Sequence, residues 1–132
     1  MGRWKDKLGS QKGFTLLEIL LMVAVLGLLA AVVIPNVTAF TRTGNLAGAN
    51  TEAQNVKTAE VAYRIDQGVW PSQTSDPAFQ KYYTGSLKAM YIFDTTGSGV
   101  GIGLIESAQA VAGGWPDNIQ FYSDTQKWEQ KR

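Results

Sequence analysis

A single acidic residue interrupts a long uncharged stretch near the N-terminus. Glu18 is the only charged side chain between Lys12 and Arg42. A carboxylate inside an apolar helix costs on the order of 3 kcal/mol at the centre of a bilayer, and less near its interface. We therefore expect Glu18 to have a partner or a specific role.

Other chemistry is limited by the residue types available. The 132 residues include no cysteine and no histidine, which removes disulfides, thiol catalysis, histidine-based triads and the usual zinc or haem ligands. Carboxylates, serines, tyrosines and lysines remain, but no pair of them has the spacing of a catalytic motif. A membrane-anchored enzyme or a binding module is the alternative from a different functional class, and we expect no enzymatic activity.

A glycine-rich run invites a phosphate-loop interpretation. Residues Gly97 to Gly103 alternate glycine with other types, but no glycine completes G-x-G-x-x-G and no lysine follows. We expect a flexible turn. The formal net charge of +1 gives no global basic field, so specific nucleic-acid binding is not expected either.

The uncharged stretch has the length of a membrane span. From Phe14 to Ile34 only Thr15 and Glu18 break the apolar run, and about 21 residues at ~1.5 Å each extend roughly 31 Å. The basic residues before it are Arg3, Lys5, Lys7 and Lys12. The positive-inside rule places them in the cytoplasm, which predicts a single-pass anchor whose C-terminal body lies outside.

Three features distinguish this segment from a plain anchor. Gly27 lies inside it and Pro35 closes it, so the helix has two weak points. Gly13 lies at its cytoplasmic side, whereas a general secretory signal is cut on the far side. An ordinary signal peptide and a generic anchor with a chance glutamate are the simpler alternatives.

The run Gly13-Phe14-Thr15-Leu16-Leu17-Glu18 resembles the prepilin signal of type IV pilins. The resemblance implies that a membrane peptidase cuts between Gly13 and Phe14 and methylates the amine of Phe14. It also implies an assembly role for Glu18, which would pair with the Phe14 amine of a neighbouring subunit. In that family the segment matching Gly27 to Pro35 can lose helicity in the filament.

The pattern beyond Pro35 predicts that the helix continues. Apolar residues recur at three- and four-residue intervals, and Gly68 is a suitable C-terminal cap before Pro71. These apolar positions are Leu46, Ala49, Ala53, Val56, Ala59 and Tyr63. We expect one helix from about residue 14 to about residue 66, with its seam in the core. The run from Ala59 to Ser72 also resembles the helix exit of many pilins and of the major pseudopilin of type II secretion.

The C-terminal part predicts a small antiparallel sheet. Expected strands are 87–93, 100–105, 119–122 and 127–129, with turns at 94–97 and 123–125. Packed on the long helix they give an α+β arrangement. The resemblance implies the type IV pilin fold. The expected organisation is a leader at 1–13, a membrane or filament-core half-helix at 14–35, an amphipathic half-helix at 36–68 and a globular region at 69–132. Trp115, Tyr122 and Trp128 are expected to be packing residues.

Cofactors and partners follow from the resemblance. Many pilins close the C-terminal region with a disulfide, which this chain lacks, and secretion pseudopilins often hold calcium there. Asp117, Asn118 and Asp124 offer oxygen ligands for calcium, although turn chemistry explains them equally well. No other cofactor is expected.

The resemblance also indicates a functional class. It implies a homo-oligomeric filament, a prepilin peptidase and methyltransferase, assembly machinery of the cytoplasmic membrane, and lipid before assembly. A pilus subunit for adhesion, motility or DNA uptake is favoured, with a type II secretion pseudopilin as the alternative. Its expected location is the bacterial cytoplasmic membrane, then a surface pilus or a periplasmic pseudopilus.

Overall fold

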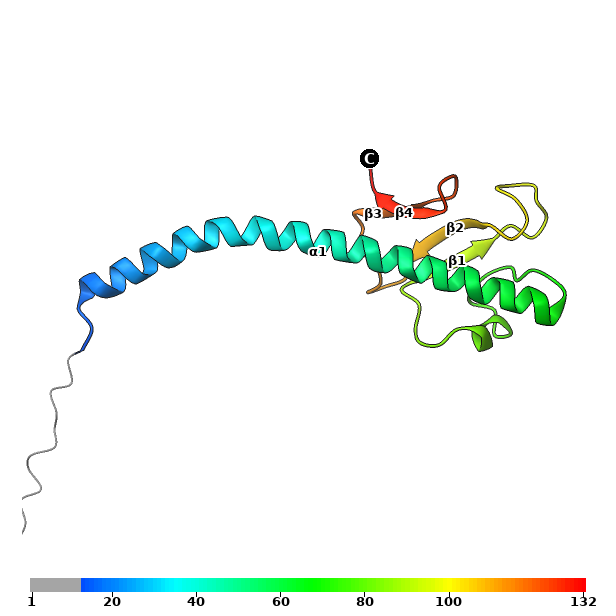
Figure 1. Cartoon of the computed structure of the whole chain (residues 1–132), viewed down its shortest axis with the longest axis horizontal. Coiled ribbons are helices and arrows are strands. Elements are labelled where there is room, and N and C mark those ends of the chain that lie inside the picture. The colour runs from blue at the N-terminus through cyan, green and yellow to red at the C-terminus, as the bar shows by residue number, and fades with distance from the viewer. Residues whose placement is uncertain (1–12) are drawn as a thin grey trace, which may run out of the picture. The chain divides into compact units, whose positions relative to one another are not determined.

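A computed structural model describes residues 13–132, so the predicted leader at 1–13 lies, except for Gly13, outside the described residues. The elements in chain order are α1 (Leu16–Gln67), η1 (Phe79–Tyr82), β1 (Ala89–Phe93), β2 (Ile105–Ala110), β3 (Ile119–Tyr122) and β4 (Lys127–Gln130) (Figure 1). The chain divides into two compact units between Ala39 and Phe40. The α+β class predicted from the sequence is confirmed.

The helix of the first unit continues through its proline. Pro35 lies within α1 and has no N–H to donate to the carbonyl of Ala31. Beside it, the Asn36 amide donates to the Val32 carbonyl (3.0 Å) and the Thr38 hydroxyl donates to the Ile34 carbonyl (3.1 Å). These side chains bond to the backbone of the same helix, which remains a helix on both sides of Pro35.

The second unit contains paired strands in separate sheets. Within residues 40–132, β1 pairs antiparallel with β2, and β3 pairs antiparallel with β4, giving two two-stranded sheets. An isolated bridge between Gln73 and Ile92 adds to the outer edge of β1. The expectation of antiparallel pairing is confirmed, but the strands do not join into one continuous sheet.

One predicted strand is wrong. Residues 100–105 were expected to be extended, whereas β2 begins only at Ile105. Gly101 and Gly103 have φ angles of 126° and 75°, which belong to a turn and not to a strand. The strand itself has the sequence Ile-Glu-Ser-Ala-Gln-Ala, and its pairing with β1 places it there despite the low β-propensity of its alanines.

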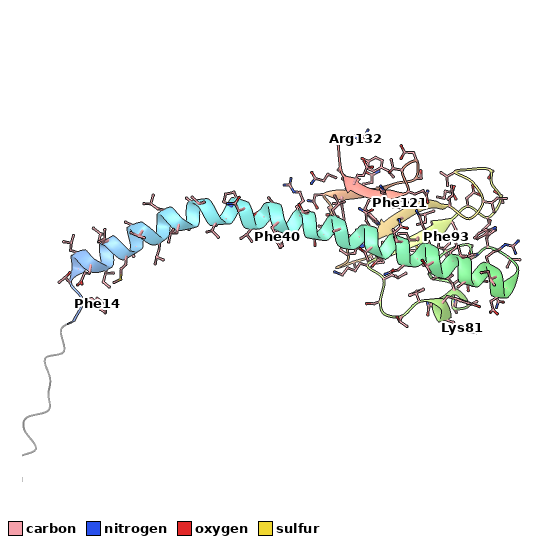
Figure 2. The ribbon with its side chains drawn as sticks, in the orientation of Figure 1. Phe14, Phe40, Lys81, Phe93, Phe121 and Arg132 are labelled. Carbon is pink, nitrogen blue, oxygen red and sulfur yellow. The ribbon has the colours of Figure 1, made fainter. Side chains whose placement is uncertain are left out.

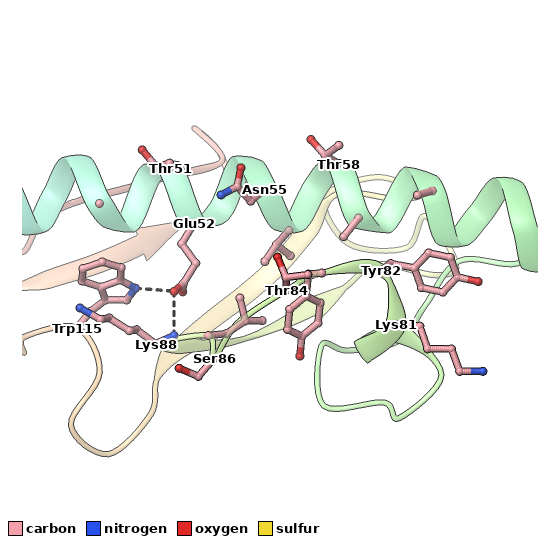
Figure 3. A pocket seen from close by; sticks show the side chains of 16 residues that line it. Thr51, Glu52, Asn55, Thr58, Lys81, Tyr82, Thr84, Ser86, Lys88 and Trp115 are labelled. Carbon is pink, nitrogen blue, oxygen red and sulfur yellow. Dashed lines mark hydrogen bonds between the residues drawn. The ribbon is translucent and has the colours of Figure 1, made fainter.

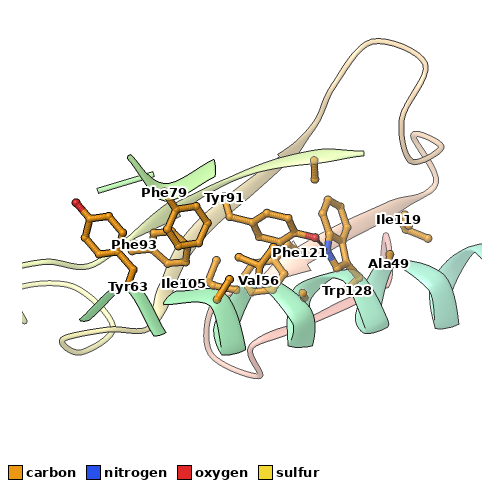
Figure 4. Packing of buried hydrophobic residues seen from close by; sticks show 13 residues of the cluster. Ala49, Val56, Tyr63, Phe79, Tyr91, Phe93, Ile105, Ile119, Phe121 and Trp128 are labelled. Atoms are coloured by element: carbon orange, nitrogen blue, oxygen red, sulfur yellow. Dashed lines mark hydrogen bonds between the residues drawn. The ribbon is translucent and has the colours of Figure 1, made fainter. Parts of the chain in front are cut away.

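The core of the second unit lies between the amphipathic part of α1 and the strands (Figure 4). The predicted helix seam is confirmed, since Val56, Ala59 and Tyr63 are all buried. Trp128 is buried, and its ring meets those of Tyr91 and Phe121 edge-on. Buried hydrophobic side chains are Ala49, Ala53, Val56, Ala59, Tyr63, Phe79, Ala89, Tyr91, Phe93, Ile105, Ile119, Phe121 and Trp128.

Side-chain amides fasten the C-terminal hairpin. Asn50 of α1 accepts the Trp128 N–H (2.8 Å) and donates to the Trp128 carbonyl (3.0 Å). Gln126 accepts the Ile105 N–H (3.0 Å) and donates to the Ile105 carbonyl (2.8 Å). Each amide thus forms the pair of bonds that a neighbouring strand residue would form. These bonds join the hairpin to α1 and to the start of β2.

The helix ends as the sequence predicts. Gly68 has a φ of 76° and donates its N–H to the Arg64 carbonyl (3.0 Å). The Arg64 guanidinium lies 5.6 Å from the centre of the Trp70 ring, so the aromatic ring is folded back on the helix. Pro71, which follows, is fully buried.

The glycine-rich turn is organised around an acid. Asp94 is 3% exposed, and its carboxylate accepts the N–H groups of Thr96, Gly97, Gly99 and Gly101 at 2.7–3.0 Å. These bonds lower the pKa of Asp94 to about 2. The sequence suggested only a flexible turn, and the backbone donors that would hold a phosphate are already bonded to Asp94.

Candidate functional site

The apolar half of α1 is the first candidate. Its side chains stand out from the helix, and every described residue from 13 to 39 is exposed, including Leu16 at 89% and, just before the helix, Phe14 at 71% (Figure 2). By length and composition, α1 is able to cross a membrane, although a signal sequence near an N-terminus would pass the same test. So large an exposed apolar surface requires a covering of lipid or protein.

Glu18 helps to begin this helix. The Thr15 N–H and hydroxyl both donate to Glu18 Oε2 (3.0 and 3.1 Å), and the Glu18 N–H donates to Thr15 Oγ1 (3.1 Å). This reciprocal arrangement is a capping box, with Thr15 just before the helix and Glu18 in its first turn. Our sequence reasoning missed it, although Thr-x-x-Glu before an apolar run is its known signature.

The remaining residues predicted for processing and assembly lie along the same segment. Gly13 and Phe14 precede the first residue of α1, so the bond between them lies in non-helical backbone. A Cβ atom built on Gly13 or Gly27 would meet no atom within 4 Å. Pro35 is inside the helix. Thus Gly13, Phe14 and Glu18 lie together at the start of α1, and Gly27 and Pro35 lie further along it.

A groove of about 820 Å³ in the second unit is the other candidate (Figure 3). It lies between α1 and the segment 81–88, and its acidic side chain is Glu52. Glu52 Oε1 accepts the Ala89 N–H (3.1 Å), the Tyr91 hydroxyl (2.9 Å) and the Trp115 indole N–H (3.1 Å). Its Oε2 accepts the Lys88 N–H (2.8 Å).

These bonds assign Glu52 a structural role. Because both of its oxygens accept hydrogen bonds, the carboxylate joins α1 to the start of β1 and to Trp115. Trp115 is partly buried against the core, and the Lys88 ammonium lies 4.5 Å from the centre of its ring. The packing role predicted for Trp115 is therefore confirmed, while the clamp formed by Glu52 was not predicted.

The calcium candidates are not brought together. Asp117 and Asn118 lie before β3, and Asp124 lies in the turn after it. At about 3.3 Å per residue, the strand between them separates the two groups by roughly 10 Å or more. Asp124 bonds the N–H of Thr125 (2.9 Å), which is turn chemistry. Calcium binding by these residues stays a prediction without geometric support.

Comparison with known proteins identifies relatives in two related systems. The chain is 33% identical to a type IV major pilin protein, PilE1, of Neisseria gonorrhoeae over 86 residues, 65% of this chain and 39% of the relative. It is 37% identical to a fimbrial protein of Neisseria meningitidis over 65 residues, 49% of this chain and 38% of the relative. Over these segments the chain is similar to type IV pilins.

The chain is also similar to a protein of a secretion system. It is 33% identical to the type II secretion system core protein G of Vibrio cholerae over 78 residues, 59% of this chain and 52% of the relative. The chain thus spans about half or less of the length of the curated relatives it matches. No protein-family model matches this chain, and no solved structure matches it.

Proposed function

We propose that this chain is a structural subunit of a type IV pilus, held in the membrane by its apolar half-helix and then polymerised through it. The observation that carries the proposal is the exposed apolar segment from Phe14 to Ile34 in a chain similar to major pilins. Lipid covers that surface before assembly, and copies of the same helix cover it afterwards. The function is structural and not enzymatic.

The start of α1 supports the processing step of the proposal. A peptidase of the cytoplasmic membrane cuts the bond between Gly13 and Phe14, and the amine of Phe14 is methylated. The bond precedes the helix, and among the described residues no atom lies within 4 Å of a Cβ atom built on Gly13, which leaves room for an enzyme's active site. The basic leader stays in the cytoplasm, and the second unit is exported.

Glu18 has two successive partners in this proposal. Its carboxylate bonds Thr15 within the same chain in the single subunit. In the filament it faces the Phe14 amine of a neighbouring copy, so that bonds from neutral donors are replaced by a contact between two opposite charges. Since an unpaired buried ion is expensive, missing the pair is penalised, and this fixes the register between copies.

Mass spectrometry of material sheared from the cell surface tests export and processing together. We expect filaments whose subunits begin at N-methylated Phe14. A subunit that starts elsewhere, or a chain that never leaves the membrane, would refute the proposal. Short periplasmic assemblies with loss of protein secretion on deletion would instead identify a secretion pseudopilin.

Two substitutions separate processing from assembly. Gly13→Leu is expected to leave the leader attached, because a bulky side chain blocks the cleavage site. Glu18→Ala is expected to be processed but to yield few filaments. Glu18→Gln is the matched variant, since its amide oxygen can still accept the Thr15 N–H but carries no charge. Normal filaments from Glu18→Gln would show that the cap matters and the charge does not.

A further inference from the structure

Glu60 is a buried acid without full hydrogen bonding. Its residue is 1% exposed, and Oε1 has no hydrogen-bond partner among the described residues. A buried charge without partners is unfavourable, so burial raises the pKa of Glu60 to about 8, against the opposing effect of the Lys57 charge. At neutral pH the carboxyl group is therefore mostly protonated.

Lys57 lies one helical turn before Glu60 and holds the C-terminal hairpin. Its ammonium donates to the Gln126 carbonyl (3.3 Å), in the turn between β3 and β4. Gln126 has a φ of 56°, an uncommon value for a residue other than glycine. Its side chain bonds Ile105 and the Ser123 carbonyl. The turn thus connects α1, β2 and the hairpin.

Few charges act on this pair. Lys57 is the charged group whose field bears on Glu60, and Lys127 of β4 acts in turn on Lys57. Desolvation and Lys127 both lower the pKa of Lys57. Arg64, one turn beyond Glu60, lies over the Trp70 ring. Lys57 is consequently the positive charge that acts on an ionised Glu60.

We propose that Glu60 and Lys57 form a proton-controlled latch on the turn between β3 and β4. While Glu60 is protonated, the Lys57 ammonium stays on the Gln126 carbonyl. When Glu60 releases its proton to solvent, the new carboxylate draws the ammonium away, because an ion pair at this i, i+3 spacing in a poorly solvated site outweighs a bond to a neutral carbonyl. The turn then loses its contact with α1.

Carbon-13 NMR of the full-length chain in detergent micelles tests the latch. The carboxyl shift of Glu60 and the carbonyl shift of Gln126 are followed as the pH is raised from about 6 to about 10. We expect both to move in one step with a common midpoint near pH 8. A Glu60 midpoint near its ordinary 4.5, or a Gln126 carbonyl that does not respond, would overturn the proposal.

Three variants give the test its controls. In Glu60→Gln the step at Gln126 should vanish, and its persistence would refute the latch. Glu106→Gln removes an exposed acid and should leave the step unchanged. In Lys57→Met the Gln126 shift should be independent of pH and resemble the high-pH value of the wild type. A wild-type low-pH value in Lys57→Met would show that Lys57 does not hold the turn.

Discussion

Replacing Glu52 by alanine should weaken the attachment of α1 to β1 in the second unit. The substitution removes an acceptor of four hydrogen bonds, from the Lys88, Ala89, Tyr91 and Trp115 donors at 2.8–3.1 Å. Lys88 is exposed, so its backbone N–H can bond water instead. The Ala89 N–H and the Tyr91 hydroxyl belong to fully buried residues and would lose their acceptor.

The magnitude follows from the two stranded donors. Each buried donor left without an acceptor costs about 1–3 kcal/mol, so we expect the free energy of unfolding to fall by about 3 kcal/mol. For a unit of this size about 1 kcal/mol lowers the melting temperature by roughly 4–8 °C, which gives a decrease of about 10–25 °C. Glu52→Gln keeps one oxygen and turns an N–H₂ group toward the other donors, so its loss should be intermediate.

Thermal unfolding of the chain in detergent micelles measures this effect. Tryptophan fluorescence is a suitable probe because Trp128 is buried and Trp115 bonds Glu52 directly. Glu106→Ala removes an exposed acid and should change stability by less than about 0.5 kcal/mol. Were Glu52→Ala to melt within about 3 °C of Glu106→Ala, the clamp would not contribute as argued.

Two further substitutions address the glycine-rich turn. The pKa of Asp94 in the folded chain, near 2, lies below its usual 3.8, so the melting temperature of the wild type should decrease as the pH falls from about 4 to about 2. In Asp94→Asn this decrease should be absent, and in the control Asp124→Asn it should remain. Gly103→Ala should destabilise by ~2 kcal/mol or more in urea unfolding, because a Cβ atom would lie 2.7 Å from the Trp70 ring at a φ of 75°. Gly85→Ala, with a φ of 95° and open space, isolates the backbone strain; equal losses in both variants would refute the clash.

Features set by local sequence were predictable. The long helix, its end at Gly68 and the hairpin 119–130 follow from apolar spacing and turn residues, which act over a few positions. The prepilin-like run at Gly13 and Phe14 is also local. The capping box of Thr15 and Glu18 was equally predictable, because it depends only on the Thr-x-x-Glu spacing before an apolar run.

Features set by distant contacts were not predictable. The position of β2 depends on its partner β1, since its own alanines, serine and glutamine favour no strand. The clamp of Glu52 joins residues 36 to 63 positions apart. Asp94 reads as an ordinary turn residue, and only the folded loop shows that four backbone donors converge on it. Glu60 lies four residues after Val56 and three before Tyr63, a spacing that places it on the buried face of α1, whereas its acidic side chain favours an exposed position.

The side-chain amides of Asn50 and Gln126 protect two strand positions from pairing with another chain. A sheet edge with unpaired N–H and C=O groups can pair with a strand of another chain. In the filament proposed above, copies of this chain would lie side by side. Asn50 occupies both backbone groups of Trp128 on the margin of β4, and Gln126 does the same for Ile105 at the first position of β2. At those two positions, the strand cannot pair with a strand of a neighbouring molecule, because its backbone groups are already bonded within the same chain.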